Sequence, residues 1–148
     1  MSCESKPKRI LMVIPINNSK FNKLAAKYVK PVVAPDFELH VTSIDAGTPY
    51  IQSRWAIAQN APHVIELVRS YESSYDGVFV SDFDNCGVEA VRECVKIPVL
   101  GGFAPQVLTM LSLAQRFSII TMSDSLLALD NSHVRPVSYT HLTLPTKA

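Results

Sequence analysis

The amino-acid sequence predicts an α/β fold, a three-layer sandwich in which a mainly parallel sheet of about five strands carries helices on both faces. Two observations lead to this prediction. Short apolar runs typical of buried strands alternate along the chain with segments whose apolar residues recur at helical spacing. Most of the apolar runs are also separated by polar, proline or glycine-containing turns, which suits the crossovers that join parallel strands.

The first half of the chain supplies two strands and two helical regions. The apolar run Ile10 to Ile14 predicts a strand buried on both faces. A helix is expected over residues 21–33, where apolar residues recur every three or four positions. The alternating segment 37–44 predicts the second strand. Residues 51–70 are helical in pattern, and Pro62 predicts a break that divides them into two pieces.

The second half continues the alternation. Strands are expected at residues 77–81, 97–100 and 117–121, and helices at residues 87–95 and 104–113. Because each helix separates two strands, the sheet should be parallel throughout, with its strands joined by right-handed crossovers.

The chain length suits one lobe with a single core. We expect residues 1–8 to be a disordered terminus and residues 9–135 to form a lobe, with a second lobe beginning near residue 117. The final segment, residues 136–148, has neither helical nor strand periodicity and is similar to a translated sequencing adapter. On this interpretation the tail is not native, and the chain is the amino-terminal part of a longer protein.

Composition excludes several classes of function. Hydrophobic residues make up 47% of the chain and charged residues 18%, with a net charge of +1, which argues against disorder and against binding to nucleic acid or an anionic membrane. No apolar run approaches the roughly 20 residues needed to span a bilayer. Cys3, Cys86 and Cys94 form no metal-ligand spacing, and their odd number suits a reducing cytoplasm. The balanced charge points to a small-molecule partner, and a homo-oligomer is left open. The absence of a glycine-rich phosphate loop argues against a nucleotide cofactor, and no histidine or further acid cluster completes a metal site.

The polar loop DFDNC, residues 82–86, is the strongest candidate for a functional site. It directly follows a predicted strand, and open parallel sheets bind ligands at the carboxyl ends of their strands. Cys86 precedes a helix whose dipole favours a thiolate, although an isolated cysteine is more often a buried core residue. Asp82 and Asp84 suit a general base or a metal pair, and equally a helix cap and a solvated acid.

Two further strand ends carry polar groups. Asn17 and Asn18 follow the first strand, where their amides can hold a carboxylate or an imide carbonyl or can simply form a turn. Thr121 ends the expected fifth strand before a helix start, where a hydroxyl and free backbone N–H groups can bind an anion. Parallel strands end at one edge, so these groups should share a crevice with the DFDNC loop.

Several segments, in the same order, resemble the aspartate/glutamate/hydantoin racemase family. ILMVIPINNSKFN is similar to the family's first strand and asparagine turn, and PYIQSRWAIAQNAPHVIELV to its helical region with the S-I-E-S and A-A-P motifs. YDGVFVSDFDNCGVEAVRECVKIPVLGGF is similar to its YDGVVIxCFxDPGxxAARExxxIPVVG segment, and RFSIIT to the RFSVVT that opens its second lobe. The resemblance extends from Arg9 to about Leu129.

The resemblance implies two α/β lobes with the active site between them and no cofactor. In this family one thiolate removes the proton on the substrate's stereocentre, and an opposite thiol protonates the other face. The resemblance also implies groups that hold the substrate and its developing enolate, by backbone or side-chain donors. Carried onto this chain, these positions are Asn17 with Asn18, Phe83, Asp84 and Asn85, and Thr121 with Met122.

The chain departs from the family pattern at the catalytic position. Asp82 stands where the family has its first cysteine, and Cys86 stands where the family has a proline after an acid. Either Asp82 carries the proton, or Cys86 has taken over, or one-sided chemistry has replaced two-sided chemistry. We therefore expect a racemase or epimerase of hydantoins or acidic amino acids, of which this chain is an inactive part. A decarboxylase or isomerase of the same superfamily and a non-catalytic small-molecule binding module are the alternatives.

Overall fold

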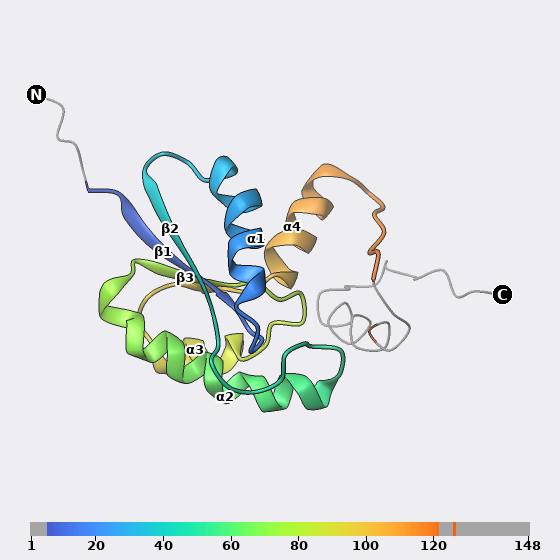
Figure 1. Cartoon of the computed structure of the whole chain (residues 1–148). Helices are drawn as coiled ribbons and strands as arrows, with labels where there is room; N and C mark the ends of the chain where they lie inside the picture. Colours follow the sequence, from blue (N-terminus) through green and yellow to red (C-terminus); the bar gives the residue numbers. More distant parts are fainter. Residues whose placement is uncertain (1–5, 122–125, 127–148) are drawn as a thin grey trace, which may run out of the picture.

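A computed structural model describes residues 6–121 and Leu126 of the chain and shows an α/β fold with one parallel sheet (Figure 1). The sheet has four strands in the order β2-β1-β3-β4. The strands are β1 (Lys8–Ile14), β2 (Phe37–Ser43), β3 (Gly77–Val80) and β4 (Val99–Leu100). The helices are α1 (Lys20–Val29), α2 (Arg54–Tyr71), α3 (Val88–Cys94) and α4 (Phe103–Leu113), and two 3-10 turns, η1 (Lys30–Val32) and η2 (Glu72–Ser74), follow α1 and α2.

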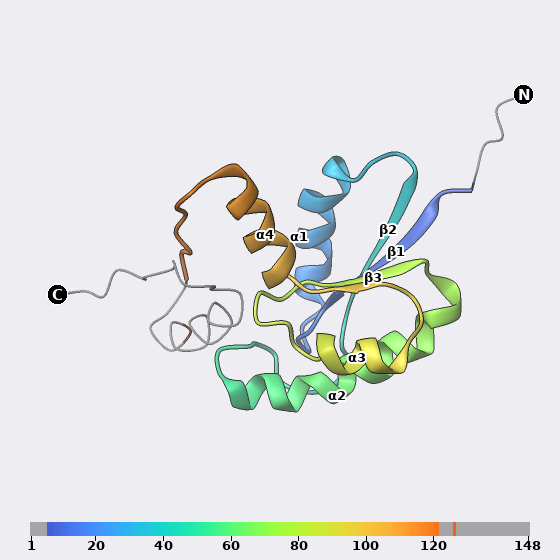
Figure 2. The same cartoon turned by 180° about the vertical axis from the view of Figure 1, so that it is seen from behind.

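Helices cover both faces of the sheet, which confirms the three-layer sandwich. α2 and α3 lie together on one face, and α1 and α4 lie on the opposite side (Figure 1 and Figure 2). The strand order explains this division, because parallel strands are joined by right-handed crossovers. The crossover from β1 to β2 places α1 on one face, and the crossovers in the opposite direction, to β3 and then β4, place α2 and α3 on the other face. The reversal between β1 and β3 is the position where open α/β sheets form a ligand crevice at the carboxyl ends of the strands.

The main core lies between the sheet and the pair of helices α2 and α3. Leu11 and Val13 of β1 belong to this core, while Met12 and Ile14, which alternate with them, are buried on the other face. β1 is therefore a central strand buried on both faces, as its unbroken apolar run predicts. The α1 face is less well covered, because α1 contains no buried residue.

Pro62 does not break α2, and the prediction of two helical pieces was wrong. The helix runs unbroken from Arg54 to Tyr71 with Pro62 inside it. Proline removes the N–H that would have bonded the carbonyl four residues earlier, on Ala58. Ala58 and Pro62 are both exposed, so water can bond that carbonyl.

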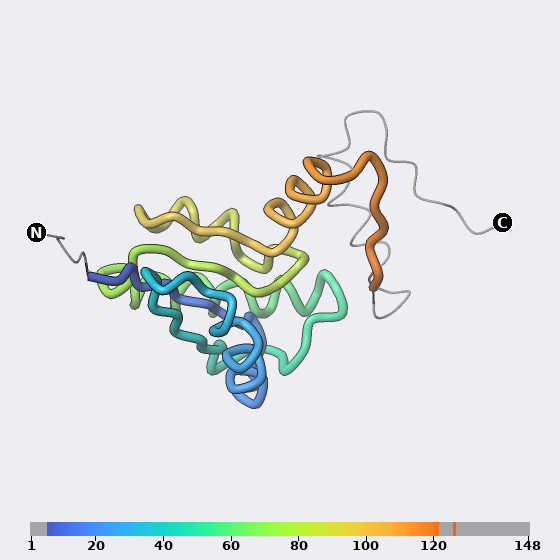
Figure 3. Tube along the Cα trace, turned by 90° about the horizontal axis from the view of Figure 1, so that it is seen from above, coloured from blue at the N-terminus to red at the C-terminus, as the bar shows by residue number. Residues whose placement is uncertain are grey.

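The sheet ends at β4, and the fifth strand expected at residues 117–121 was wrong. These residues have no regular secondary structure, and the chain that contains them runs past the carboxyl end of the sheet after α4 (Figure 3). A strand needs a hydrogen-bonding neighbour, and within the described part of the chain this segment has no strand to pair with.

Smaller differences concern the ends of elements. α1 ends at Val29 rather than near residue 33, and Pro31 lies in the 3-10 turn that follows. β1 already begins at Lys8, inside the terminus expected to be irregular. The rest of that expectation, residues 1–5, and the expected non-native tail, residues 136–148, lie outside the described residues. Among the helices that the structure describes, none has the length and apolar character needed to cross a membrane.

Candidate active site

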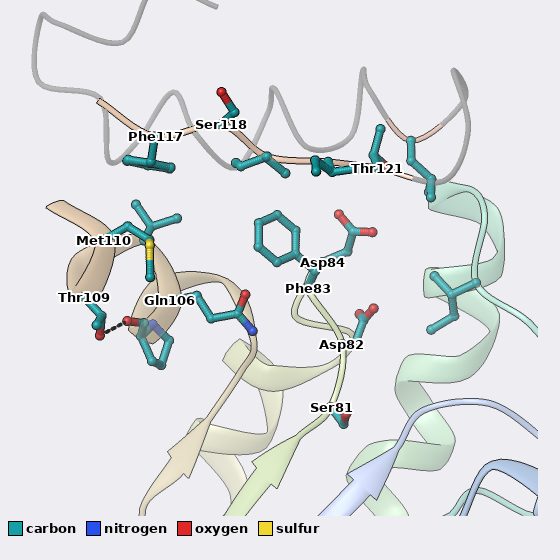
Figure 4. A pocket seen from close by; sticks show the side chains of 16 residues that line it. Ser81, Asp82, Phe83, Asp84, Gln106, Thr109, Met110, Phe117, Ser118 and Thr121 are labelled. Carbon is teal, nitrogen blue, oxygen red and sulfur yellow. Dashed lines mark hydrogen bonds between the residues drawn. The ribbon is translucent and has the colours of Figure 1, made fainter. Parts of the chain in front are cut away.

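A cleft of about 880 Å³ opens beyond the carboxyl end of β3 (Figure 4). Its walls are the loop between β3 and α3, the helix α4 and the segment 117–121, with Ile51 at one side. Much of the described lining is apolar, and polar side chains are interspersed with it. These polar residues are Ser81, Asp82, Asp84, Gln106, Thr109, Ser118 and Thr121.

The loop between β3 and α3, here called the β3 loop (residues 82–87), has a backbone shape that its sequence favours. Asn85 has a φ of 57° and Gly87 a φ of 73°, so both occupy the left-handed region. Asparagine and glycine are the residues that tolerate this region best. The side-chain oxygen of Asn85 also accepts a hydrogen bond of 3.4 Å from the backbone N–H of Phe103, the first residue of α4. The loop is thereby connected to the start of α4.

Two glycines after β4 let the β3 loop come close. The N–H of Gly102 donates to the carbonyl oxygen of Asp82 at 3.0 Å. A Cβ atom on Gly102 would lie 2.7 Å from that oxygen, and one on Gly101 would lie 2.1 Å from the side-chain oxygen of Asn85. A larger residue at position 102 would therefore displace the loop backbone at Asp82, and one at position 101 would displace the side chain of Asn85.

Two carboxylates, those of Asp82 and Asp84, lie in the cleft (Figure 4). Asp82 is partly buried, and its Oδ2 accepts the backbone N–H of Cys86 at 2.9 Å, which fixes the carboxylate against its own loop. Asp84 is 8% exposed. Among the described residues that line the cleft there is no lysine, arginine or histidine.

Cys86 is placed differently from the two aspartates. Its side chain is fully buried in the main core, and its thiol donates to the carbonyl oxygen of Ile57 in α2 at 3.5 Å. Burial, with a smaller contribution from the charges of Asp82 and Asp84, raises the pKa of the Cys86 thiol to about 12. The thiol is therefore protonated at neutral pH and points into the core, so the geometry favours the core interpretation of this cysteine.

The asparagines after β1 are not among the described residues that line the cleft. Asn17 is exposed, and its backbone N–H donates to the carbonyl of Thr48 at 2.9 Å. The side-chain oxygen of Asn18 accepts the N–H of Lys20 at 3.3 Å, which is the turn-forming role expected as an alternative. Among the described residues, the side chain of Asn17 forms no comparable turn-forming hydrogen bond.

The remaining candidates divide into two groups. Phe83, Asp84 and Thr121 line the cleft, and the ring of Phe83 also meets that of Phe103 edge to face, with centroids 5.2 Å apart. Asn85 does not line the cleft, and its side-chain bond to the N–H of Phe103 connects the loop to α4. Met122 lies outside the described residues.

The structure adds two polar residues that the sequence interpretation missed. Gln106 lines the cleft from α4 (Figure 4). Asn60 is fully buried in α2, where Ala56, Val64 and Val68 are its buried neighbours along the helix. A polar residue within this buried stripe was the available signal for Asn60, because a buried amide must find hydrogen-bond partners. Nothing in the local pattern distinguishes Gln106 from an ordinary surface glutamine.

The described residues contain no group of three or more histidine, cysteine, aspartate or glutamate side chains that could hold a metal ion. Asp82 and Asp84 therefore have no third ligand of these types in the described part of the chain. The arrangement is one that acid–base chemistry can use, because carboxylates line a largely apolar cleft at a strand end.

Comparison with known proteins gave a family and two solved structures. The family model described as Asp/Glu/Hydantoin racemase matches residues 10–129. Allantoin racemase from Klebsiella pneumoniae is 27% identical with a TM-score of 0.80, and the match covers 87% of this chain and 53% of that one. Allantoin racemase from Pseudomonas fluorescens is 20% identical with a TM-score of 0.81, covering 87% of this chain and 55% of that one, and supports the fold alone.

This chain thus spans about half the length of both solved structures. No curated protein matches it.

Proposed function

The chain belongs to the Asp/Glu/hydantoin racemase family, and from that premise we propose that it supplies one wall of a cofactor-independent racemase site with Asp82 as the proton carrier. The observation that carries the proposal is the contrast between two side chains of one loop. Asp82 lines the cleft, whereas Cys86 is buried in the core with its thiol pKa raised to about 12. Of the two side chains, only the Asp82 carboxylate lines the cleft, where a substrate can reach it.

The proposed reaction begins with removal of the proton from a carbon next to a carbonyl group. The Asp82 carboxylate takes this proton, and the electron pair of the broken C–H bond moves onto the neighbouring carbonyl as an enolate. Return of a proton to the opposite face inverts the stereocentre, and return to the same face restores it. With no delocalising cofactor in the proposal, hydrogen-bond donors around the cleft must stabilise the enolate oxygen.

Similarity to a solved racemase favours one of the two substrate types. An uncharged ring such as hydantoin presents an acidic C–H next to a carbonyl. The solved structure from Klebsiella pneumoniae, 27% identical to this chain, is named an allantoin racemase, which supports a ring substrate. We therefore favour a hydantoin-type substrate.

Inversion requires an acid on the opposite side of the substrate. The chain covers about half of each solved structure, and the resemblance implies a second lobe facing the first. In this proposal the second lobe supplies the opposite acid, so the 148-residue chain by itself does not racemise.

The experiment is hydrogen-to-deuterium exchange at the substrate's stereocentre in D₂O, followed by ¹H NMR, with racemisation followed by circular dichroism. The protein carrying both lobes should exchange and racemise hydantoins and allantoin in preference to aspartate, and the 148-residue chain should racemise neither. Preference for aspartate would contradict the substrate assignment. Release of carbon dioxide from a carboxylated substrate, without racemisation, would instead establish the decarboxylase alternative. Binding without exchange would leave only a small-molecule binding module.

A further inference from the structure

The side-chain amide of Asn60 connects two chain segments that are far from it in sequence. Its Nδ2 donates to the carbonyl of Pro15 at 2.8 Å and to the carbonyl of Thr48 at 3.3 Å. Its Oδ1 accepts the N–H of Thr48 at 2.6 Å and the hydroxyl of Thr48 at 3.1 Å. Both amide protons are therefore used, in a side chain with no solvent exposure, and the Thr48 hydroxyl near Oδ1 also lies 2.6 Å from the carbonyl of Tyr50, to which it can donate instead.

These bonds reach the turn between β1 and α1, here called the β1 turn (residues 15–18). The Thr48 carbonyl that Asn60 holds is the same one that accepts the backbone N–H of Asn17. Gly47 makes this close approach possible, because it has a φ of 95° and a Cβ there would lie 2.5 Å from Oδ1 of Asn60. The position of Asn17 thus depends on Asn60 through one shared carbonyl and through Pro15.

The same turn of α2 also supports the β3 loop. The carbonyl of Ile57, three residues before Asn60, accepts the thiol of Cys86. A Cβ on Gly87 would lie 3.2 Å from the carbonyl oxygen of Ala61, so the loop backbone runs close to the residue after Asn60. Residues 57–61 of α2 therefore contact both strand-end segments, the one with Asn17 and the one with Asp82.

We infer that Asn60 is a positioning residue for the proposed reaction: its buried amide holds the β1 turn so that Asn17 lies in register with Asp82 on the β3 loop. Asn60 touches no substrate. The inference takes Asn17 as a substrate-holding group, the role that the resemblance to the racemase family implies for it, and assigns its position to Asn60. The inference rests on the proposed function, because the alignment has a purpose only if both groups act on one substrate.

The first arm of the test measures the geometry in the 148-residue chain by amide hydrogen exchange. Asn60→Leu keeps the number of side-chain heavy atoms but removes the hydrogen-bond partner of the Pro15 carbonyl and of the backbone N–H and carbonyl of Thr48. Exchange of the Asn17 N–H should accelerate at least about tenfold relative to the Val78 N–H, which bonds Pro98 in the sheet. Thr48→Val removes the hydroxyl contacts with Asn60 and with the Tyr50 carbonyl but keeps both backbone bonds to the amide, so it should give a smaller change in the same direction. This variant keeps the test valid if Asn60→Leu does not fold.

The matched control is Ser53→Ala, which removes the N-cap of the same helix, where the Ser53 hydroxyl accepts the N–H of Ala56 at 3.2 Å. It should lower the thermal midpoint by a few degrees, roughly the effect of losing an N-cap. It should not accelerate exchange of the Asn17 N–H relative to the Val78 N–H. Equal effects of Ser53→Ala and Asn60→Leu on Asn17 would overturn the inference, since Asn60 would then contribute only general stability.

The second arm measures kcat and KM for hydantoin in the two-lobe protein. Asn60→Leu should lower kcat/KM about 100-fold through both constants, because displacement of a positioned group by about 1 Å can cost this much. Ser53→Ala should stay within about twofold. An unchanged kcat/KM in an Asn60→Leu protein that has lost Asn17 protection would overturn the inference while leaving the proposed function intact. If the wild-type two-lobe protein shows no deuterium exchange into the substrate, the proposed function is wrong. The positioning role in that reaction is then wrong as well, even if the first arm shows that Asn60 holds the β1 turn.

Discussion

The β3 loop and the β1 turn lie at neighbouring strand ends, yet they are held in place in different ways. The β3 loop is shaped by its own backbone, with Asn85 and Gly87 in the left-handed region, and by glycines that let it approach α4. No residue of the β1 turn has a positive φ. The turn is held from outside, through Thr48 and the buried amide of Asn60.

This difference implies two kinds of sensitivity. A loop held by close backbone approach is damaged when volume is added, because there is no space for a Cβ. A turn held by one buried side chain is damaged when a polar group is removed, because its partners lose their hydrogen bonds. The two segments also differ in function under our proposal, since the loop carries the base and the turn carries a substrate-holding amide.

The largest effect is expected from Asp82→Asn. The carboxamide can still accept the Cys86 N–H, but it cannot take a proton from carbon. Substrate exchange in D₂O by the two-lobe protein should fall about 10³-fold, within the usual range for loss of a general base. Asp45→Asn is the control, because Asp45 is exposed and outside the described lining of the cleft. A loss smaller than about threefold would remove Asp82 from the mechanism.

Gly102→Ala tests whether the β3 loop is sensitive to added volume, because it places a methyl group against the loop backbone. The new Cβ would lie 2.7 Å from the Asp82 carbonyl oxygen, so the loop must shift. We expect the free energy of unfolding to fall by about 3 kcal/mol in urea titrations followed by circular dichroism. The matched control is Gly77→Ala, where the nearest atom to a Cβ is 3.5 Å away. Similar losses in the two variants would show that close approach is not what limits position 102.

Asn17→Ala tests the β1 turn by removing a side chain while leaving the backbone N–H that bonds Thr48. Because Asn17 is exposed, the free energy of unfolding should change by less than about 0.5 kcal/mol. KM for hydantoin should rise about tenfold, the usual consequence of losing one hydrogen bond to substrate. Gln59→Ala, an exposed amide on α2 outside the described lining, serves as the control. An unchanged KM would assign Asn17 to turn formation alone.

The smallest effect on activity is expected from Cys86→Ala, which should keep substrate exchange within about threefold because the thiol is buried and protonated. In the unmodified chain, iodoacetamide should label the exposed Cys94 and leave Cys86 unreacted, as measured by peptide mass spectrometry. Rapid labelling of Cys86 in the folded protein would contradict its burial.

The raised pKa of Cys86 also predicts a pH dependence of stability. The unfolded thiol ionises near its ordinary value of 9.0 and the folded one near about 12, so this contribution to stability is present below pH 9 and is lost as pH rises toward 12. Between pH 8 and pH 10.5 the free energy of unfolding should fall by about 2 kcal/mol less in Cys86→Ala than in the wild type. Parallel declines would show that another group is responsible.

Much of the fold could be predicted because the relevant signals are local. The apolar run of β1 and the spacing along α2 each reflect which side of one element is buried, and that pattern is visible within a few residues. The same logic located the DFDNC loop at a strand end beside the cleft. The errors occurred where a distant partner decides the outcome. Pro62 stays inside α2 because its neighbourhood is exposed, and residues 117–121 stay outside the sheet because pairing needs a neighbour.

The candidate site shows the same limit. Sequence reasoning selected Asp82 and Cys86 together, because they are four residues apart in one polar loop. It could not separate them, because the direction of each side chain depends on packing against α2 and on the path of the chain after β4. Asn60 was missed for the same reason, since its partners Pro15 and Thr48 are 45 and 12 residues away.

The sequence by itself determined the order of strands and helices, the buried character of β1 and the position of a polar loop at the end of β3, because these properties follow from the residues' own polarity and spacing. The tertiary structure decided which polar groups of that loop face the cleft, which one is buried, and that a single amide in α2 joins the β1 turn to its surroundings. These outcomes depend on hydrogen bonds and close contacts between segments far apart in the chain, and no local pattern records them.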